Sequence, residues 1–301
     1  MTAPLIEVRD VHKVFATGGV LSRRRDHAVN GVSFALPADT PEIFTIIGES
    51  GSGKTTIARM ILGNEVPTRG QILVAGRDVT QRRSRAERLA FMARVQPIFQ
   101  NPFEAFNPLK RVDRYMEITA RRFLRARTRA EIERPVEEAL ENVGLSLQEV
   151  RRRYPHELSG GQLQRTAIAR ALICRPAVIV ADEPVSMVDA SLRMSIVNLF
   201  KRLRKEFGVS IIYITHDLAT AYYISDRLVV MQKGHVVEAG PARPILDAPM
   251  HPYSQLLKRS VLSIDDAGSG RIVAADRAAA DAIIGRGALQ QVSDGRLVRL
   301  A

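Results

Sequence analysis

Short apolar runs recur along the chain, and each is followed by glycine or by residues that carry chemistry. Ile43–Ile47 precedes a glycine-rich loop, Ala177–Ala181 precedes two acids, and Ser210–Thr215 precedes a histidine. Runs of this length, rich in β-branched residues, are typical of strands that are buried on both faces of a parallel sheet. Helical spacing of apolar residues follows at Ile57–Leu62 and at Leu163–Leu172, so the pattern predicts an α/β core.

The N-terminal segments have a different pattern. Leu5–His12 and Val32–Leu36 partly alternate apolar with polar residues, which predicts paired strands of an antiparallel lip. The segment between them, Gly18–Arg25, is glycine-rich and then basic, so we expect an exposed loop. Phe15 ends the first of these strands. Its ring either stacks on an adenine base or belongs to the core, and the pattern does not decide between the two.

The strand at Ile43–Ile47 leads directly into a phosphate-binding pattern. Residues 48–55 match G-x-x-x-x-G-K-[ST], and a helical segment follows. In such a loop, backbone N–H groups and the helix N-terminus bind phosphate oxygens, the lysine reaches the outer phosphates and the Thr55 hydroxyl is offered to Mg²⁺. A glycine-rich turn with a chance lysine does not explain the flanking strand and helix. The expected nucleotide-binding residues are Gly48, Glu49, Ser50, Gly51, Ser52, Gly53, Lys54, Thr55 and Thr56.

Two other strand ends carry candidate catalytic residues. Asp182 and Glu183 follow a buried strand, as the metal and water side of a P-loop ATPase requires. We expect Asp182 to hold Mg²⁺ through a water and Glu183 to face the attacking water; the alternative is a pair of surface acids. His216 follows the next strand, at an edge where open α/β sheets bind ligands. It contacts the γ-phosphate or is a hydrogen-bonded core residue.

A long helical region lies between the strands. From Leu109 to Leu147 the spacing is helical and many residues are charged, which predicts a small helical subdomain inserted at about residues 101–165. The preceding strand ends at Gln100. Ser159, Gly160, Gly161 and Gln162 then precede apolar residues at helical spacing, which predicts a capped helix with its N-terminus open to an anion.

Composition adds bounds on partners and compartment. The 301 residues include 44 Lys and Arg against 32 Asp and Glu, a net charge of +12. This surplus suggests nucleic acid or an anionic membrane leaflet nearby; the alternative is arginine-rich solvated helix faces. The single cysteine, Cys174, excludes an internal disulfide and a multi-cysteine metal site, and we expect a packed thiol. With no leader and no long apolar run, we expect a cytosolic chain that reaches membranes through partners.

In this order, the motifs resemble those of the ATP-binding subunit of an ABC transporter, over about residues 4–260. The motifs are the phosphate loop, Gln100, Leu158–Gln162, Asp182 with Glu183, Asp189 and His216. The resemblance implies an α/β fold, namely a P-loop ABC ATPase with a RecA-like core, an antiparallel β lip and an inserted helical subdomain. It implies ATP and Mg²⁺ as cofactors. Residues 1–260 would form the ATP-binding domain, with 261–301 as an extension whose role the sequence does not indicate.

The resemblance also implies a role for each site residue. Gln100 would join Mg²⁺ and sense nucleotide, and His216 would contact the γ-phosphate. The segment Ser159–Gln162 would close on ATP held by a second subunit, with which Asp189 would communicate. We assign Glu183 as the catalytic base.

In the C-terminal extension, residues 261–301, we expect a helix over residues 273–284 and a strand at Gly295–Leu300.

Within this family, the chain looks most like the second of the two paired ATPases of oligopeptide and dipeptide importers. Four stretches suggest it: Leu21–Arg25, Phe99–Pro102 with Asn107 and Pro108, Tyr154–Glu157, and His251–Tyr253. The implied partners are two transmembrane permease subunits, a related ATPase in a heterodimer and an extracytoplasmic solute-binding protein, with no direct nucleic acid. The implied location is peripheral, on the cytoplasmic face of the inner membrane. Because relatives import oligosaccharides or nickel, the cargo stays open.

The chain departs from relatives at one informative place. Many carry a cysteine cluster after the His-Pro-Tyr motif that suits an iron–sulfur centre, but residues 254–301 contain no cysteine, so we expect no cluster. Two rival functions remain. A DNA-associated ABC ATPase is disfavoured by the short helical insert. An accessory ATPase of a soluble complex, as in phosphonate degradation, is disfavoured only by the His251–Tyr253 element.

Overall fold

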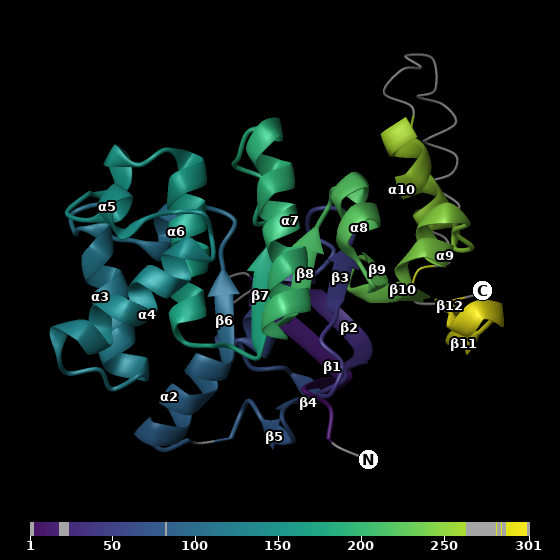
Figure 1. The fold of residues 1–301 in the computed structure, drawn as a ribbon. Coiled ribbons are helices and arrows are strands. Elements are labelled where there is room, and N and C mark those ends of the chain that lie inside the picture. Colours follow the sequence, from purple (N-terminus) through teal and green to yellow (C-terminus); the bar gives the residue numbers. More distant parts are fainter. Residues whose placement is uncertain are drawn as a thin grey trace. The chain divides into compact units, whose positions relative to one another are not determined.

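The computed structural model describes residues 3–17, 24–81, 83–262, 281, 284 and 287–299. The chain divides into two compact units, and Figure 1 labels their helices and strands. Unit 1 comprises Met1–Gln81 and Ile214–Ala301, and unit 2 comprises Arg82–Tyr213.

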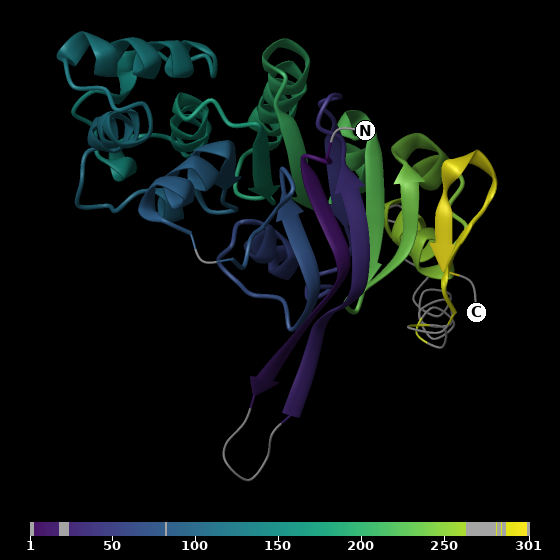
Figure 2. The same ribbon diagram turned by 90° about the horizontal axis from the view of Figure 1, so that it is seen from below.

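Unit 1 contains the predicted antiparallel lip. Strand β1 (Ile6–Thr17) pairs on one side with β2 (Arg24–Leu36) and on the other with β4 (Arg69–Val74), which continues to β5 (Arg77–Asp78). Figure 2 shows β1 and β2 side by side along a long ribbon. The expected loop at Gly18–Arg25 is too long, since Arg24 and Arg25 already pair in β2. Residues 18–23 lie outside the described residues.

A second set of strands in unit 1 carries the phosphate loop. Strand β3 (Ile43–Ile47), buried at every position, runs parallel to β9 (Arg227–Gln232). Strand β9 forms a hairpin with β10 (His235–Pro241). The sheet continues through β12 (Leu297–Arg299), which pairs with β10, and β11 (Leu289–Gln291). The predicted C-terminal strand is therefore present but shorter, and C-terminal residues extend this sheet.

Helices pack on these strands through an apolar cluster. Among the described residues, the helices of unit 1 are α1 (Lys54–Ile61), α8 (Leu218–Ile224), α9 (Ala242–Asp247) and α10 (Pro252–Leu262), with a 3₁₀ turn η4 (Ser293–Gly295). Ile47, Val230, Val237, Ile245 and Tyr253 belong to one buried cluster. The cluster joins the end of β3 to β9, β10, α9 and α10. Apart from Asp281 and Ile284, the helix expected over residues 273–284 lies outside the described residues.

Unit 2 holds the predicted helical region. Strand β6 (Val95–Ile98) is parallel to β7 (Val178–Asp182), and β8 (Ser210–Thr215) follows β7 in the strand order. The helical elements between β6 and β7 are η1 (Pro102–Ala105), α3 (Val112–Phe123), α4 (Arg129–Glu141), α5 (Leu147–Val150), η2 (Pro155–Glu157) and α6 (Gly160–Ile173). Helix α7 (Ala190–Phe207) follows β7.

Helix α2 (Arg85–Arg94) was not predicted. None of its described side chains is fully buried, so its apolar spacing is weak. A local signal was present, because Ser84 and Glu87 form a capping box at its start. Among the helices that the structure describes, none is both long and apolar enough to span a membrane.

Candidate nucleotide site

The glycine-rich loop of unit 1 lies between β3 and α1, as the motif requires. A Cβ on Gly48 would lie 2.2 Å from the carbonyl oxygen of Met231, and one on Gly53 would lie 2.2 Å from that of Ala28. Only glycine fits where two backbones approach this closely. Gly53 has φ 99° and is the N-cap of α1, so the loop turns sharply into the helix. The positive end of α1 therefore faces the loop, which favours an anion.

Lys54 folds back over this loop. Its ammonium donates to the carbonyl oxygens of Gly48 at 2.8 Å and Glu49 at 2.7 Å, and lies 3.5 Å from the Ser52 hydroxyl oxygen. The lysine is only 4% exposed, and these bonds compensate the loss of hydration of its charge. Ser50, Gly51 and Thr55 are exposed, whereas Glu49, Gly53 and Thr56 are half-buried. The loop thus presents an ammonium and hydroxyl groups together.

Two further candidates lie in unit 1. Phe15 is half-buried, and the ammonium of Lys13 lies 4.8 Å from its ring centroid, which does not decide between core packing and adenine stacking. His216 is exposed directly after β8, so the core alternative for this histidine is wrong. The next residue, Asp217, begins α8 by accepting hydrogen bonds from the N–H groups of Ala219 and Thr220.

The two acids lie at the end of β7 in unit 2. Asp182 is the last residue of the strand, and both carboxylates are half-buried rather than fully exposed. Glu183 has φ +46°, an unusual backbone conformation for a side chain of this size and one that is often found at functional sites. The turn is closed by Ser186, whose N–H and hydroxyl both donate to the Glu183 carbonyl oxygen. These two hydrogen bonds hold the turn that carries the Glu183 carboxylate.

Gln100 and Glu183 meet although they are far apart in sequence. The side-chain amide of exposed Gln100 donates to Glu183 Oε2 at 3.1 Å. A carboxylate oxygen accepts more than one hydrogen bond, so this contact orients the group and leaves it able to take a proton. The structure thus brings together two of the three residues that the sequence assigned to catalysis.

Ser159–Gln162 form the start of α6. The Ser159 hydroxyl accepts from the Gln162 N–H at 3.2 Å, and the Gln162 side chain accepts from the Ser159 N–H at 3.1 Å. Ser159 and Gly160 are exposed, while a Cβ on Gly161 would lie 2.5 Å from Leu192 Cδ1 of α7. The exposed helix N-terminus predicted from the sequence is present. Asp189, also exposed, is the N-cap residue of α7.

Two buried residues that support the site were not predicted. Gln164 is 0% exposed, and its amide donates to the Pro184 carbonyl oxygen, just after Glu183. Tyr253 is 2% exposed, and its hydroxyl accepts from the Glu49 N–H at 2.9 Å. Only the resemblance singled out the segment containing Tyr253, and no pattern indicated its partner.

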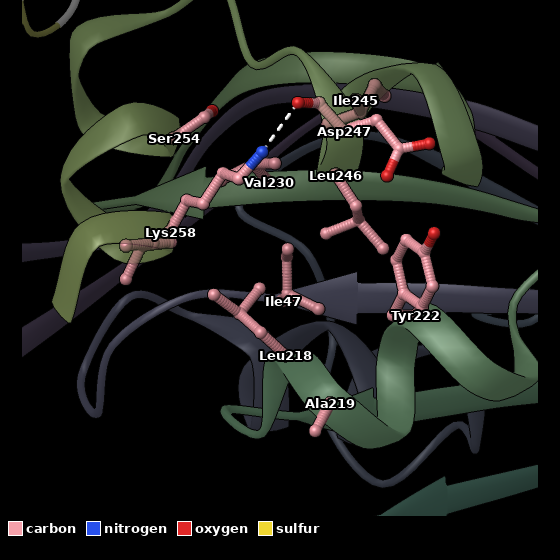
Figure 3. A pocket seen from close by; sticks show the side chains of 11 residues that line it. Ile47, Leu218, Ala219, Tyr222, Val230, Ile245, Leu246, Asp247, Ser254 and Lys258 are labelled. Carbon is pink, nitrogen blue, oxygen red and sulfur yellow. Dashed lines mark hydrogen bonds between the residues drawn. The ribbon is translucent and has the colours of Figure 1, made fainter. Parts of the chain in front are cut away.

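A pocket of about 220 Å³ lies in unit 1, next to the apolar cluster that contains Ile47, Val230 and Ile245. Figure 3 shows its apolar wall, including Ile47, Leu218 and Val230, and the Lys258 ammonium donating to the Asp247 carbonyl oxygen. None of the residues assigned to nucleotide binding lines this pocket, so it is not part of the candidate site.

The single cysteine, Cys174, is buried, which confirms the packed thiol. Burial raises the pKa of its thiol to about 12.

Comparisons with known proteins show the family of the chain. The ABC transporter family model matches residues 29–186. The oligopeptide transport ATP-binding protein OppF of Streptococcus pyogenes serotype M1 is 38% identical over 261 residues, covering 87% of this chain and 83% of the relative. OppF of Bacillus subtilis (strain 168) is 40% identical over 261 residues, with the same two coverages.

Solved structures show the same fold. The dimeric structure of MJ0796, a bacterial ABC transporter cassette, has a TM-score of 0.68 and 28% identity, covering 79% of this chain and 99% of that one. Its dimeric post-hydrolysis state bound to ADP and Pi gives a TM-score of 0.69 and 26% identity. From the phosphate loop, the family match and these relatives, we conclude that the chain belongs to the ABC transporter family and has the fold of its ATP-binding cassettes.

Proposed function

We propose that this chain is the ATP-hydrolysing subunit of a membrane importer that takes up oligopeptides. The observation that supports hydrolysis is the hydrogen bond from Gln100 to Glu183 at the end of β7. The same chain has a phosphate loop whose lysine, Lys54, is hydrogen-bonded to the loop backbone. The observation that carries import is the identity of 38% and 40%, over most of the chain, to relatives named as oligopeptide transport ATP-binding proteins.

In this function the phosphate loop of unit 1 binds ATP. Lys54 exchanges loop carbonyl oxygens for phosphate oxygens, and the N–H groups at the start of α1 bind the remaining phosphate charge. Phe15, half-buried next to Lys13, is the candidate to stack on adenine. His216, exposed at the end of β8, contacts the γ-phosphate.

The chain also offers suitable ligands for Mg²⁺. The exposed Thr55 hydroxyl, the half-buried Asp182 carboxylate and the exposed Gln100 amide are hard oxygen donors, the type that this ion prefers. When bound, Mg²⁺ neutralises charge that develops on the phosphates. Asp182 would hold it through a water.

Glu183 acts as the general base. Its carboxylate takes a proton from the attacking water while Gln100 holds it in orientation through the bond to Oε2. Glu183 has a positive φ directly after β7, so the backbone turns at this residue. The buried Gln164 amide stabilises the turn by donating a hydrogen bond to the Pro184 carbonyl oxygen.

A second ATPase subunit completes each site. The exposed start of α6 at Ser159–Gln162 would close on ATP held by that partner, and Asp189 would report across the interface. Two of the structural neighbours are dimers of ABC cassettes, which supports this arrangement. We propose a related but different chain as the partner, so that the pair is a heterodimer.

The importer also contains two permease subunits and an extracytoplasmic solute-binding protein, with this chain on the cytoplasmic face of the membrane. Coupling would run through Asn101–Pro108, which follows Gln100 directly and exposes Phe103 at 47%. Residues 1–260 would form the ATP-binding domain, with about 101–165 as its helical subdomain and 261–301 as an extension. The cargo is an oligopeptide, a dipeptide or a related solute.

The test is a tagged purification from native membranes in mild detergent, with mass spectrometry of the proteins that co-purify and an untagged strain as control. We expect two multi-span proteins, a second ATPase and a solute-binding protein. Recovery only from the soluble fraction, together with enzymes or DNA, would replace import with one of the two rival functions and leave ATP hydrolysis in place.

A further inference from the structure

The peptide group between Gly48 and Glu49 is held from both sides. Its N–H donates to the Tyr253 hydroxyl at 2.9 Å, and its C=O accepts from the Lys54 ammonium at 2.8 Å. In a trans peptide the N–H and C=O groups point in opposite directions within one rigid plane. A single plane therefore connects the tyrosine to the lysine of the phosphate loop.

This plane is not fixed by local preferences. Glycine at position 48 accepts a wide range of backbone angles, so the peptide that follows it rotates easily unless something outside the loop holds it. No larger residue is possible, because a Cβ on Gly48 would overlap the Met231 carbonyl oxygen. The orientation of the Gly48–Glu49 peptide therefore depends on the hydrogen bonds at its two ends.

Tyr253 is a rigid support for this purpose. It is 2% exposed and belongs to the apolar cluster that contains Ile47 and Val230. Figure 3 shows Ile47 and Val230 where they line the neighbouring pocket. Its own N–H donates to His251 Nδ1 at 3.1 Å. His251 is 0% exposed, and its N–H donates to Glu238 Oε2 at 3.2 Å. A chain of buried polar contacts thus fixes the tyrosine.

The C-terminal part of the chain completes this support. Arg296 is 7% exposed and precedes β12; its guanidinium donates to the carbonyl oxygens of Ala248 at 2.8 Å and Pro244 at 3.2 Å. It lies 4.0 Å from Glu238 Oε1, which also accepts from the Met250 N–H. Arg296 therefore offsets the buried charge of Glu238 and anchors the turn that leads into Tyr253.

We propose that Tyr253 is a positioning residue for nucleotide binding: it orients the Gly48–Glu49 peptide and, through the carbonyl of that peptide, the ammonium of Lys54. The proposal rests on the nucleotide-binding function proposed above. A loop that is already oriented loses less conformational freedom when it binds phosphate, so the tyrosine hydroxyl raises affinity without contacting the ligand.

Tyr253→Phe removes the hydroxyl and keeps the ring in its cluster. In the full chain we expect the dissociation constant for Mg²⁺ with the non-hydrolysable analogue AMP-PNP to rise roughly 3- to 10-fold, the loss expected for one hydrogen bond, measured by calorimetry. Tyr222→Phe is the matched control. Tyr222 lies in the same unit and is 39% exposed, so the same atom is removed away from the loop and affinity stays unchanged.

A second readout separates positioning from packing. In the nucleotide-free wild type we expect the Glu49 amide to be protected from hydrogen exchange, followed by NMR. In Tyr253→Phe it should exchange roughly 3- to 10-fold faster, while amides of β9 and β10 keep their rates. A general loss of packing would instead speed exchange across those strands.

The outcomes are distinct. An unprotected Glu49 amide in the wild type, or equal affinity and equal Glu49 exchange in Tyr253→Phe and wild type, overturns the role of Tyr253. Failure of the wild type itself to bind Mg²⁺ and AMP-PNP counts against the proposed nucleotide site instead. Weaker binding with selective loss of Glu49 protection supports the inference.

Discussion

At the scale of single residues, the proposed phosphate binding and the proposed proton transfer each depend on a charged side chain that neighbouring groups hold in place. Lys54 is almost fully buried, yet its ammonium has two carbonyl oxygens as acceptors. Glu183 is held by Gln100 on its side chain and by Ser186 on its backbone. A charge that is oriented before the substrate arrives needs little reorganisation during the reaction.

Lys54→Ala should lose nucleotide affinity. It removes a charge-assisted contact to phosphate, so we expect Mg²⁺–ATP to bind roughly 10- to 100-fold more weakly, as measured by titration calorimetry. Lys205→Ala is the control, because this lysine is exposed near the end of α7 and plays no part in the loop. Unchanged affinity in Lys54→Ala would refute the assignment of Lys54 to the phosphates.

Glu183→Gln should separate binding from hydrolysis. The amide keeps the shape and accepts the hydrogen bond from Gln100, but it takes no proton from water. We expect nucleotide affinity close to that of the wild type and phosphate release slower by roughly 10²- to 10⁴-fold. Glu141→Gln, exposed at the end of α4, is the matched control. Hydrolysis by Glu183→Gln at the wild-type rate would mean that another group is the base.

At the scale of elements, helix starts in unit 2 repeat one local device. Capping boxes begin α2 at Ser84, α4 at Thr128, α5 at Ser146 and α6 at Ser159. Each satisfies N–H groups that the helix itself leaves without acceptors. The device is the same at each start, so only its position distinguishes the start of α6, which we propose closes on a partner's ATP, from the other three.

Ser159→Ala and Ser84→Ala should therefore agree in stability and differ in activity. Loss of either cap should lower the free energy of unfolding by about 1 kcal/mol, measured by urea denaturation. Only Ser159→Ala should slow ATP hydrolysis in the assembled transporter, because only α6 begins with the segment assigned to the partner's ATP. Equal hydrolysis rates for the two variants would show that the Ser159 hydroxyl acts as a cap alone.

At the scale of the whole molecule, residues from distant parts of the sequence form one cluster of buried polar side chains in unit 1. Glu238 of β10 and His251 before α10 are both 0% exposed, and Arg296 approaches them from the C-terminal region. Burial, with a smaller effect of Arg299, lowers the pKa of His251 to about 4. The neutral imidazole is the form that accepts the Tyr253 N–H at Nδ1.

The chain should consequently lose stability in mild acid through His251. The unfolded histidine, with a pKa near 6.5, binds a proton that the native state does not bind until about pH 4. The contribution is complete above about pH 6.5 and is lost as the pH falls towards 4, so about 2 kcal/mol should be gone at about pH 5. His251→Asn keeps an acceptor and does not titrate there.

Urea unfolding of both proteins at about pH 7.5 and about pH 5 measures this difference. The wild type should lose about 2 kcal/mol more than His251→Asn between the two conditions. Equal losses would show that His251 titrates alike in the folded and unfolded chain.

Local patterns in the sequence predicted a large part of the fold. The buried run Ile43–Ile47, the glycine loop after it and the helix that follows are encoded within one short stretch, so their structure was readable from residue types alone. The same holds for the capped start of α6. Helix α2 was missed because its apolar spacing is weak, although its capping box was visible.

The sequence by itself determined which residue types are available for the proposed chemistry and the order of the elements that present them, because these depend on residue type and on spacing over a few positions. Tertiary structure alone decided that Tyr253 meets the Glu49 N–H, 204 positions away, and that β12 joins the sheet beside β10. It also decided that Gln100 meets Glu183 and that His216 is exposed. These features arise where distant segments pack, and packing between distant segments leaves no periodic signal in the chain.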